Sequence, residues 1–170
     1  MASTIDWAMV SAWAAMVTAV GAIVAIWLQN RHATVTRSLD ILFRLEAKFD
    51  GDRMKQLRRT AASGFLAGRF SDEAYYVLDF FEEAGLLLRL KAIHEEILFE
   101  SFYHSIPAYW FTAKKYVVEM RRTNPELYDN LELVAERALR YSTRKTGQDA
   151  ARSGDASSWK YFMEREAQAS

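Results

Sequence analysis

Two Glu-Glu doublets and a histidine lie close together in the stretch FFEEAGLLLRLKAIHEEI, residues Phe80 to Ile97. Carboxylates and imidazoles are groups that bind metal ions or transfer protons. The segment HEEIL, which starts at His94, is similar to the helix of zinc proteases, in which two histidines four residues apart bind the ion. The second ligand position is Leu98 here. We therefore interpret His94 and the acids after it as the start of a helix, where the helix dipole favours carboxylates.

Glu100 and His104 are a second candidate pair, one helical turn apart. Carboxylate metal sites in four-helix bundles need Glu-x-x-His on two helices together with further glutamates, and this spacing does not occur in the sequence. The chain has no cysteine, which excludes thiolate ligands and thiol nucleophiles. We predict no catalytic residue, no metal site and no cofactor. The protein is expected not to be an enzyme, with an unrecognised hydrolase as the alternative.

The first element that the sequence predicts is a membrane span. No ionisable side chain lies between Asp6 and Arg31, and 22 mostly apolar residues run from Trp7 to Leu28. As a helix rising about 1.5 Å per residue, this run reaches roughly 33 Å, which matches a hydrocarbon core of about 30 Å. A cleaved signal peptide would need a basic start, and a buried core helix this apolar would need a larger domain. The predicted membrane anchors are Trp7, Trp13 and Trp27.

The charges beside this run predict its orientation. Arg31 and Arg37 follow it, whereas the short N-terminal side carries Asp6. By the positive-inside rule, the N-terminus is outside and the C-terminal domain is cytoplasmic, at the cell inner membrane. Small residues at helical spacing would let the span pack closely against another helix, although alanine-rich spans are also found unpaired. The predicted packing residues are Ser11, Ala15, Ala19, Gly21 and Ala25.

The rest of the chain has helical periodicity and no alternating stretch long enough to predict a sheet. One amphipathic stretch ends at FDGDR, residues 49–53, and a second follows to about residue 70. A third helix is predicted from the N-cap Ser71 to Gly85, a residue type that suits the left-handed position after a helix.

Two further helices are predicted beyond the apolar connector that follows Gly85. One runs from about His94 to Arg122 and is kinked by Pro107, because proline lacks the backbone N–H of the helix interior. The other opens at Asn124, as an N-cap before a proline, and ends near Tyr141.

Residues 142–158 lose this periodicity and are predicted to be a flexible tail. Apolar residues then recur on one helical face at Trp159, Phe162 and Met163. This ending is interpreted as a short docking helix or as a segment that folds only against a partner.

Two groups of residues are candidates for binding partners. Aromatic residues on a second strip of the long helix favour burial in the core, with a partner surface as the alternative: Phe99, Tyr103 and Trp110. Basic residues after the apolar run are expected to contact anionic lipid, with a solvated face as the alternative: Arg31, Arg37, Arg53, Lys55, Arg58 and Arg59.

Global charge does not predict a nucleic-acid partner. Lys plus Arg equals Asp plus Glu at 22 each, so the formal net charge is zero. The charge is unevenly distributed, because residues 71–108 carry eight acids and two bases, whereas residues 29–70 carry nine bases and four acids. This acidic segment is therefore expected to pack against the basic segment.

Three segments carry a resemblance to a known family: SLDILFRLEAKFDGDRMKQLRRTAA from Ser38, VLDFFEEAGLLLRLKAIHEEILFESF from Val77, and YW at Tyr109. They resemble a bacterial family of single-pass membrane proteins with a helical cytoplasmic domain, known as domain of unknown function number 4760. Similar sequences often have a glycine near Ala92 and an aspartate at the position of His94. The resemblance implies no catalytic residue.

These observations predict an all-α protein with one N-terminal transmembrane helix and a cytoplasmic bundle of about four or five helices. The expected parts are residues 1–30 as the anchor, 31–141 as the helical domain and 142–170 as the tail. The predicted function is that of a non-enzymatic accessory subunit of a membrane protein complex. Its expected partners are the bilayer and other membrane subunits or a second copy, with no nucleic acid and no small-molecule substrate. The alternative is a membrane-tethered signalling or stress/defence effector that self-associates.

Overall fold

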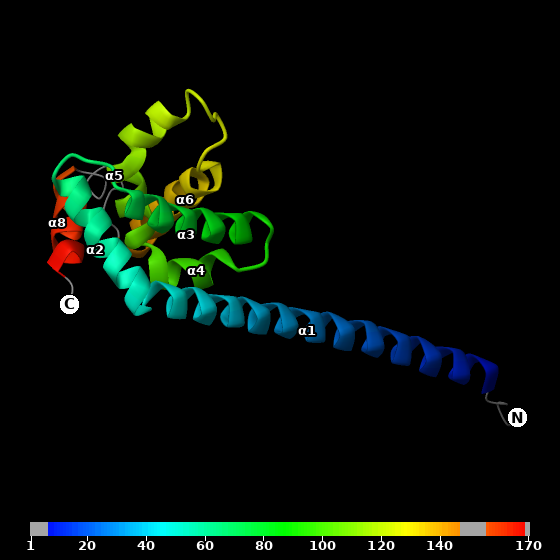
Figure 1. The fold of residues 1–170 in the computed structure, drawn as a ribbon. Coiled ribbons are helices and arrows are strands. Elements are labelled where there is room, and N and C mark those ends of the chain that lie inside the picture. Colours follow the sequence, from blue (N-terminus) through cyan, green and yellow to red (C-terminus); the bar gives the residue numbers. More distant parts are fainter. Residues whose placement is uncertain (1–6, 147–155, 169–170) are drawn as a thin grey trace, which may run out of the picture. The chain divides into compact units, whose positions relative to one another are not determined.

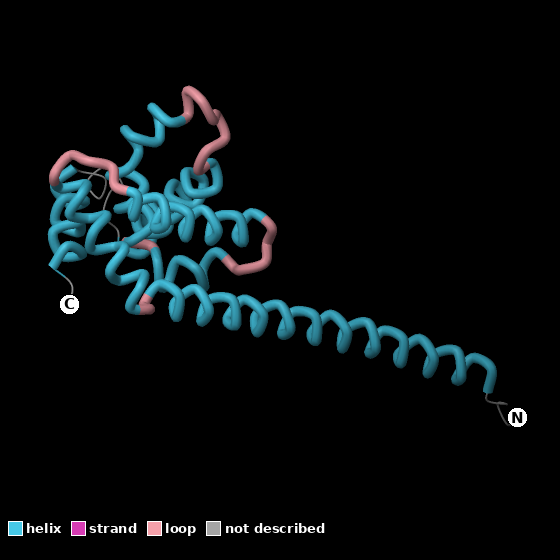
Figure 2. Tube along the Cα trace, viewed as in Figure 1, coloured by secondary structure: helices cyan, strands magenta, loops and turns pink. Residues whose placement is uncertain are grey.

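The structure, a computed structural model, describes residues 7–146 and 156–168 of the 170-residue chain. All regular elements in these ranges are helices joined by short loops, as Figure 2 shows. Tertiary contacts divide the chain into two compact units, Met1–Arg37 and Ser38–Ser170. The prediction of an all-α fold is therefore confirmed for the described residues.

The first unit contains the N-terminal part of α1, a helix that runs from Trp7 to Phe49 and passes residue 30 without a break (Figure 1). Within the described ranges, no helix combines the length and the apolar character needed to cross a membrane. The predicted transmembrane helix over residues 1–30 is therefore wrong. The apolar run belongs to one helix of 43 residues whose later turns carry charged residues such as Arg37 and Asp40. This finding does not test the predicted location at the inner membrane, which stays a prediction.

The second unit is a helical bundle that also includes the last turns of α1, from Ser38 onward. Its helices are α2 (Asp52–Leu66), α3 (Asp72–Arg89), α4 (Glu95–Phe102), α5 (Ser105–Met120), α6 (Asp129–Thr146) and α8 (Ala156–Gln168). α3 packs on α2 and α6, while α5 packs on α6 and α8 (Figure 1). The largest fully buried side chains include Phe80 and Phe81 on α3 and Tyr109 and Trp110 on α5.

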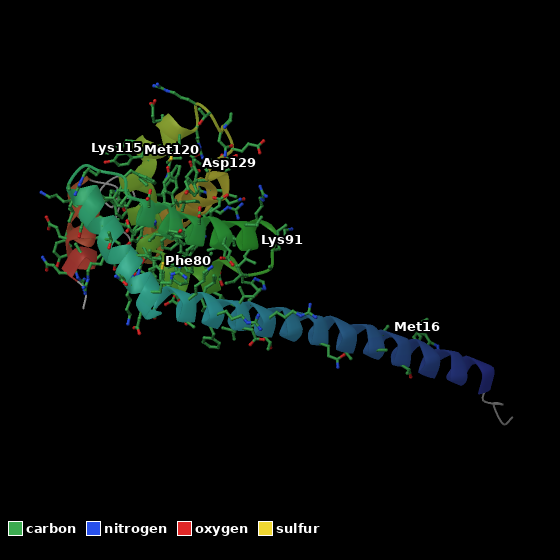
Figure 3. The ribbon with its side chains drawn as sticks, viewed as in Figure 1. Met16, Phe80, Lys91, Lys115, Met120 and Asp129 are labelled. Carbon is green, nitrogen blue, oxygen red and sulfur yellow. The ribbon has the colours of Figure 1, made fainter. Side chains whose placement is uncertain are left out.

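Aromatic rings hold the end of α1 in this core. The ring centroid of Phe49 lies 5.3 Å from that of Phe80, 5.7 Å from that of Phe81 and 5.2 Å from that of Phe102. Phe80 is labelled within the bundle in Figure 3. Because Leu42 and Leu45 are also buried, the amphipathic spacing expected for this stretch is realised in the last turns of α1.

Gly85 does not end α3, contrary to the prediction. The helix continues to Arg89, and the left-handed conformation occurs later, at Lys91 with φ of 57°. A Cβ atom on Gly85 would overlap the backbone carbonyl of Asn130. Glycine is needed here because α3 and the start of α6 approach each other backbone to backbone.

The long helix predicted from His94 to Arg122 is two helices. α4 ends at Phe102 and α5 begins at Ser105. Pro107 is the third residue of α5, and the first turn of a helix tolerates proline because its N–H groups have no partner inside the helix. The predicted mid-helix kink at Pro107 is therefore wrong.

The last two helices also differ from their predicted ends. α6 begins at Asp129 rather than near Asn124, directly after Tyr128, whose φ is 61°. It continues past Tyr141 to Thr146. The predicted short terminal helix is present as α8 and packs on α2 and α5 of the same chain.

Candidate functional site

Glu82, in the first Glu-Glu doublet, caps a helix that begins 47 residues later in the chain. Its carboxylate accepts hydrogen bonds from the backbone N–H groups of Asn130 at 3.3 Å and Leu131 at 2.7 Å. It also accepts one from the Asn130 side-chain amide at 2.6 Å. The first N–H groups of a helix have no partner within the helix, and its dipole favours an anion there. Glu82 therefore supplies the N-terminal cap of α6 from the middle of α3.

The other acids of the opening stretch form ion pairs. Glu83 pairs with Lys48 at the end of α1, and both side chains are about half exposed. Glu95 lies 3.4 Å from Arg137 and 3.7 Å from Arg144, both on α6.

His94 is the N-cap residue of α4, so the interpretation of its position as a helix start is confirmed. Its side chain forms no capping hydrogen bond, and its backbone N–H donates to Ser38 Oγ at 3.3 Å. Within the described residues, no three His, Asp or Glu side chains gather closely enough to hold a metal ion.

Glu100 and His104 are engaged separately. Lys145 donates to both carboxylate oxygens of Glu100, at 2.7 and 2.9 Å, and the Tyr141 hydroxyl donates at 2.8 Å. These hydrogen bonds, first from Lys145 and then from Tyr141, lower the pKa of Glu100. The pKa of His104 is lowered by partial burial and, to a smaller extent, by the charge of Lys145.

The most buried charged cluster joins three helices and contains none of the residues of the opening stretch. Arg58 on α2 donates from Nη1 to both oxygens of Glu166 on α8, at 3.2 and 2.9 Å. The Tyr109 hydroxyl on α5 donates to Glu166 Oε2 at 2.9 Å. The side chains of Arg58 and Glu166 are only 10% and 16% exposed. A pair this buried is strongly destabilising when one partner is removed, because the other charge is left uncompensated.

The surroundings of this cluster orient its charged groups. The guanidinium carbon of Arg58 lies 3.9 Å from the centroid of the Phe49 ring, which is a cation–π contact. Burial, followed by the nearby charge of Glu166, raises the pKa of Tyr109 well above its ordinary value. Tyr109 is therefore a neutral hydrogen-bond donor, and Arg58 provides the cation that the buried carboxylate requires.

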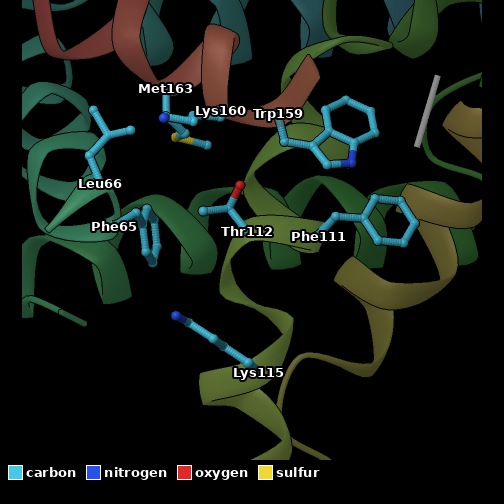
Figure 4. Close-up of a pocket in the computed structure, with 8 residues that line it drawn as sticks. All are labelled: Phe65, Leu66, Phe111, Thr112, Lys115, Trp159, Lys160 and Met163. Atoms are coloured by element: carbon cyan, nitrogen blue, oxygen red, sulfur yellow. The ribbon is translucent and has the colours of Figure 1, made fainter. Parts of the chain in front are cut away.

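The same three helices, α2, α5 and α8, also line a pocket of about 330 Å³ that is partly open to solvent. Figure 4 shows the eight side chains that line it: Phe65, Leu66, Phe111, Thr112, Lys115, Trp159, Lys160 and Met163. The Trp159 ring stacks on Phe111, with centroids 5.7 Å apart and planes inclined by 13°. The Trp159 indole N–H is buried and has no acceptor among the described residues.

Sequence reasoning missed the role of Arg58 and Glu166. A usable signal was present on α8, because Glu166 follows Trp159 by seven residues and so continues the apolar strip of Phe162 and Met163. The buried Arg58 was grouped with the lipid-facing basic residues. In the structure it is ion-paired inside the bundle, whereas Arg37, Arg53, Lys55 and Arg59 are exposed. The side chain of Arg31 lies outside the described residues.

The aromatic strip considered as a partner surface lies mostly in the core. Phe99 and Trp110 are fully buried, which is the interpretation that the sequence favoured. Tyr103 is half-buried and contacts Tyr141 at a ring-centroid distance of 6.1 Å.

Three exposed apolar residues lie on one side of α1. Trp13 is 62% exposed, Met16 58% and Val20 56%, at spacings of three and four residues. Met16 is labelled on α1 in Figure 3. Gly21 and Ala25, two predicted packing residues, are also exposed. The side chains of the remaining predicted anchor and packing residues lie outside the described part: Trp7, Ser11, Ala15, Ala19 and Trp27.

Comparison with curated proteins and with solved structures gives no match. One family model, described as a domain of unknown function (DUF4760), matches residues 12–138. The bacterial source and the membrane location that the resemblance implied stay predictions. Because the matched range covers more than half of the chain, the protein belongs to this family, DUF4760.

Proposed function

We propose that this protein is a non-enzymatic accessory subunit that binds other protein subunits through the exposed apolar face of α1. The observation that carries the proposal is the strip of Trp13, Met16 and Val20, each more than half exposed. A contiguous apolar strip on a helix is typical of a face that packs against a partner. We propose a membrane protein complex as the assembly to which such a subunit would belong.

The proposal that the protein is not an enzyme is supported by the structural contacts of its candidate acidic residues. Glu82 caps α6, Glu83 and Glu95 form ion pairs, and Glu100 binds Lys145 and Tyr141. These acids hold elements of the fold together. Their hydrogen bonds and ion pairs account for their positions without a substrate.

The test compares the full chain with a variant in which Trp13, Met16 and Val20 are all replaced by serine. A matched control carries Ala22→Ser and Ala25→Ser. These residues are exposed and lie on the opposite side of the helix, at about 100° per residue. Each protein is affinity-purified from its native cells, and its native mass and stoichiometric partners are measured. We expect the wild type and the control to retain partner subunits and the triple variant to lose them.

Other outcomes of this measurement favour other functions. A homo-oligomer without other subunits would support the self-associating effector. A monomer with turnover that is lost in Glu100→Gln or His104→Ala would show that the protein is an enzyme.

A further inference from the structure

The groove between α2 and α5 is filled by a helix that lies outside the family match. The match ends at residue 138, whereas α8 begins at Ala156. The main contacts of α8 within the described part of the chain are with α2 and α5. The segment that covers this groove is therefore not included in the family match.

α8 enters the groove as an amphipathic helix with regularly spaced anchors. Trp159 stacks on Phe111, and Phe162 contacts the ring of Tyr109 edge-on at 5.9 Å. Met163 is buried in the same face. Anchors at positions i, i+3, i+4 and i+7 are typical of a helix that binds in a groove, and here the fourth anchor is the carboxylate of Glu166.

The groove selects for that carboxylate. Arg58 is buried and stacked on Phe49, and Tyr109 points its hydroxyl at the same acceptor. Replacing the carboxylate by a neutral group would leave the Arg58 cation buried without an anion, which is costly. A groove built in this way discriminates between helices by charge as well as by apolar fit.

In the described part of the chain, the contact of α8 with the groove leaves two buried hydrogen-bond donors unused. The Nε of Arg58 and the indole N–H of Trp159 are buried without an acceptor among the described residues. A pocket of about 330 Å³, partly open to solvent, lies along the same contact (Figure 4). Buried polar groups are almost always paired in protein cores, so the two unpaired donors leave hydrogen-bonding capacity that another helix could use.

We propose that the groove between α2 and α5 is a helix-binding surface that α8 occupies within its own chain. The partner it fits is an amphipathic helix of another protein with an aromatic anchor and a carboxylate seven residues later. Such a helix would replace α8 and bind Arg58 and Tyr109 through that carboxylate. This inference is independent of the binding role proposed for α1, because it concerns a different surface.

The test uses the full chain with a protease site placed between Thr146 and Ala156, so that α8 can be cut free while it is still bound. A fluorescent peptide of residues 156–168 is then titrated onto the cleaved protein, and anisotropy reports exchange. Unlabelled peptides with Glu166→Gln and Glu164→Gln serve as competitors. Both remove one acid by the same change, but Glu164 is exposed on α8. We expect the Glu166→Gln peptide to compete roughly tenfold or more weakly than the Glu164→Gln peptide.

Four results would overturn the proposal. Cleavage that unfolds the bundle, seen as lost helical circular dichroism, would show that α8 is an integral part of the fold. A folded cleaved protein that binds no peptide would exclude an exchangeable groove, and equal competition by the two peptides would exclude selection by the carboxylate. An uncleaved dimer that the peptide dissociates would replace the foreign partner with a second copy of this chain.

Discussion

Gly85 on α3 and Asn130 on α6 touch backbone to backbone, so that a Cβ atom on Gly85 would overlap the Asn130 carbonyl. The same stretch of α3 carries Glu82, whose carboxylate binds the N–H groups of Asn130 and Leu131. The close approach and the cap therefore belong to one arrangement. The N-terminus of α6 can contact the side of α3 for two reasons. Gly85 provides the space, and Glu82, one turn earlier, provides the hydrogen-bond acceptor.

Gly85→Ala is expected to lower the free energy of unfolding of the second unit by about 2 kcal/mol, because overpacking forces the two backbones apart. Urea denaturation followed by circular dichroism measures this loss. Gly21→Ala is the matched control, since it makes the same change in a helix where the new Cβ would meet no atom of another element within 4 Å. An unchanged stability of Gly85→Ala would contradict the close approach of α3 and α6.

Glu82→Ala is expected to cost about 1–2 kcal/mol of stability, because the first N–H groups of α6 lose their acceptor. Glu83→Ala makes the same change at the next position of α3, but it removes only an exposed ion pair, which contributes about 0–1 kcal/mol. The difference between the two variants in urea denaturation isolates the cap. Equal costs would show that Glu82 does not stabilise α6.

Arg58→Met is expected to destabilise the protein by about 3 kcal/mol or more, because the buried Glu166 loses its cation. Arg53→Met is the control on the same helix, and its exposed side chain should contribute within about 0.5 kcal/mol. Thermal or urea unfolding compares the two. Similar small effects in both variants would argue against a buried ion pair that holds α8.

Alkaline pH is expected to weaken the fold through Tyr109. Burial and the charge of Glu166 raise the pKa of Tyr109 in the folded protein, whereas an unfolded tyrosine titrates near 10. Above that pH the unfolded chain releases a proton that the folded protein keeps, so stability falls by up to about 1.4 kcal/mol per pH unit. The contribution is fully present below pH 10 and is lost as the pH rises.

Tyr109→Phe removes this titration. Its stability difference from the wild type, measured by urea unfolding, should be constant between about pH 7 and 9 and should shrink above about pH 10. A difference that stays constant up to pH 11 would contradict the raised pKa.

Local sequence patterns determined much of the helical framework. The break after Phe49 and the start of α4 at His94 were predicted, and a short helix near Trp159 was one of two interpretations of the ending. Such features depend on periodicity and capping preferences within a few residues, and these can be read directly from the sequence. The apolar run before Leu28 was identified as well, but its reading as a membrane span was wrong.

Only the tertiary structure decided what the charged and special residues do. Glu82 acts on residues 48 and 49 positions away, and Arg58 meets Glu166 across 108 positions. Gly85 was predicted to end a helix because glycine suits the left-handed position after one. Its actual role depends on Asn130, which comes from another element and lies 45 positions away. Local propensity favours the same interpretation of a glycine or an acid wherever it occurs, whereas its actual role depends on the element that packs against it.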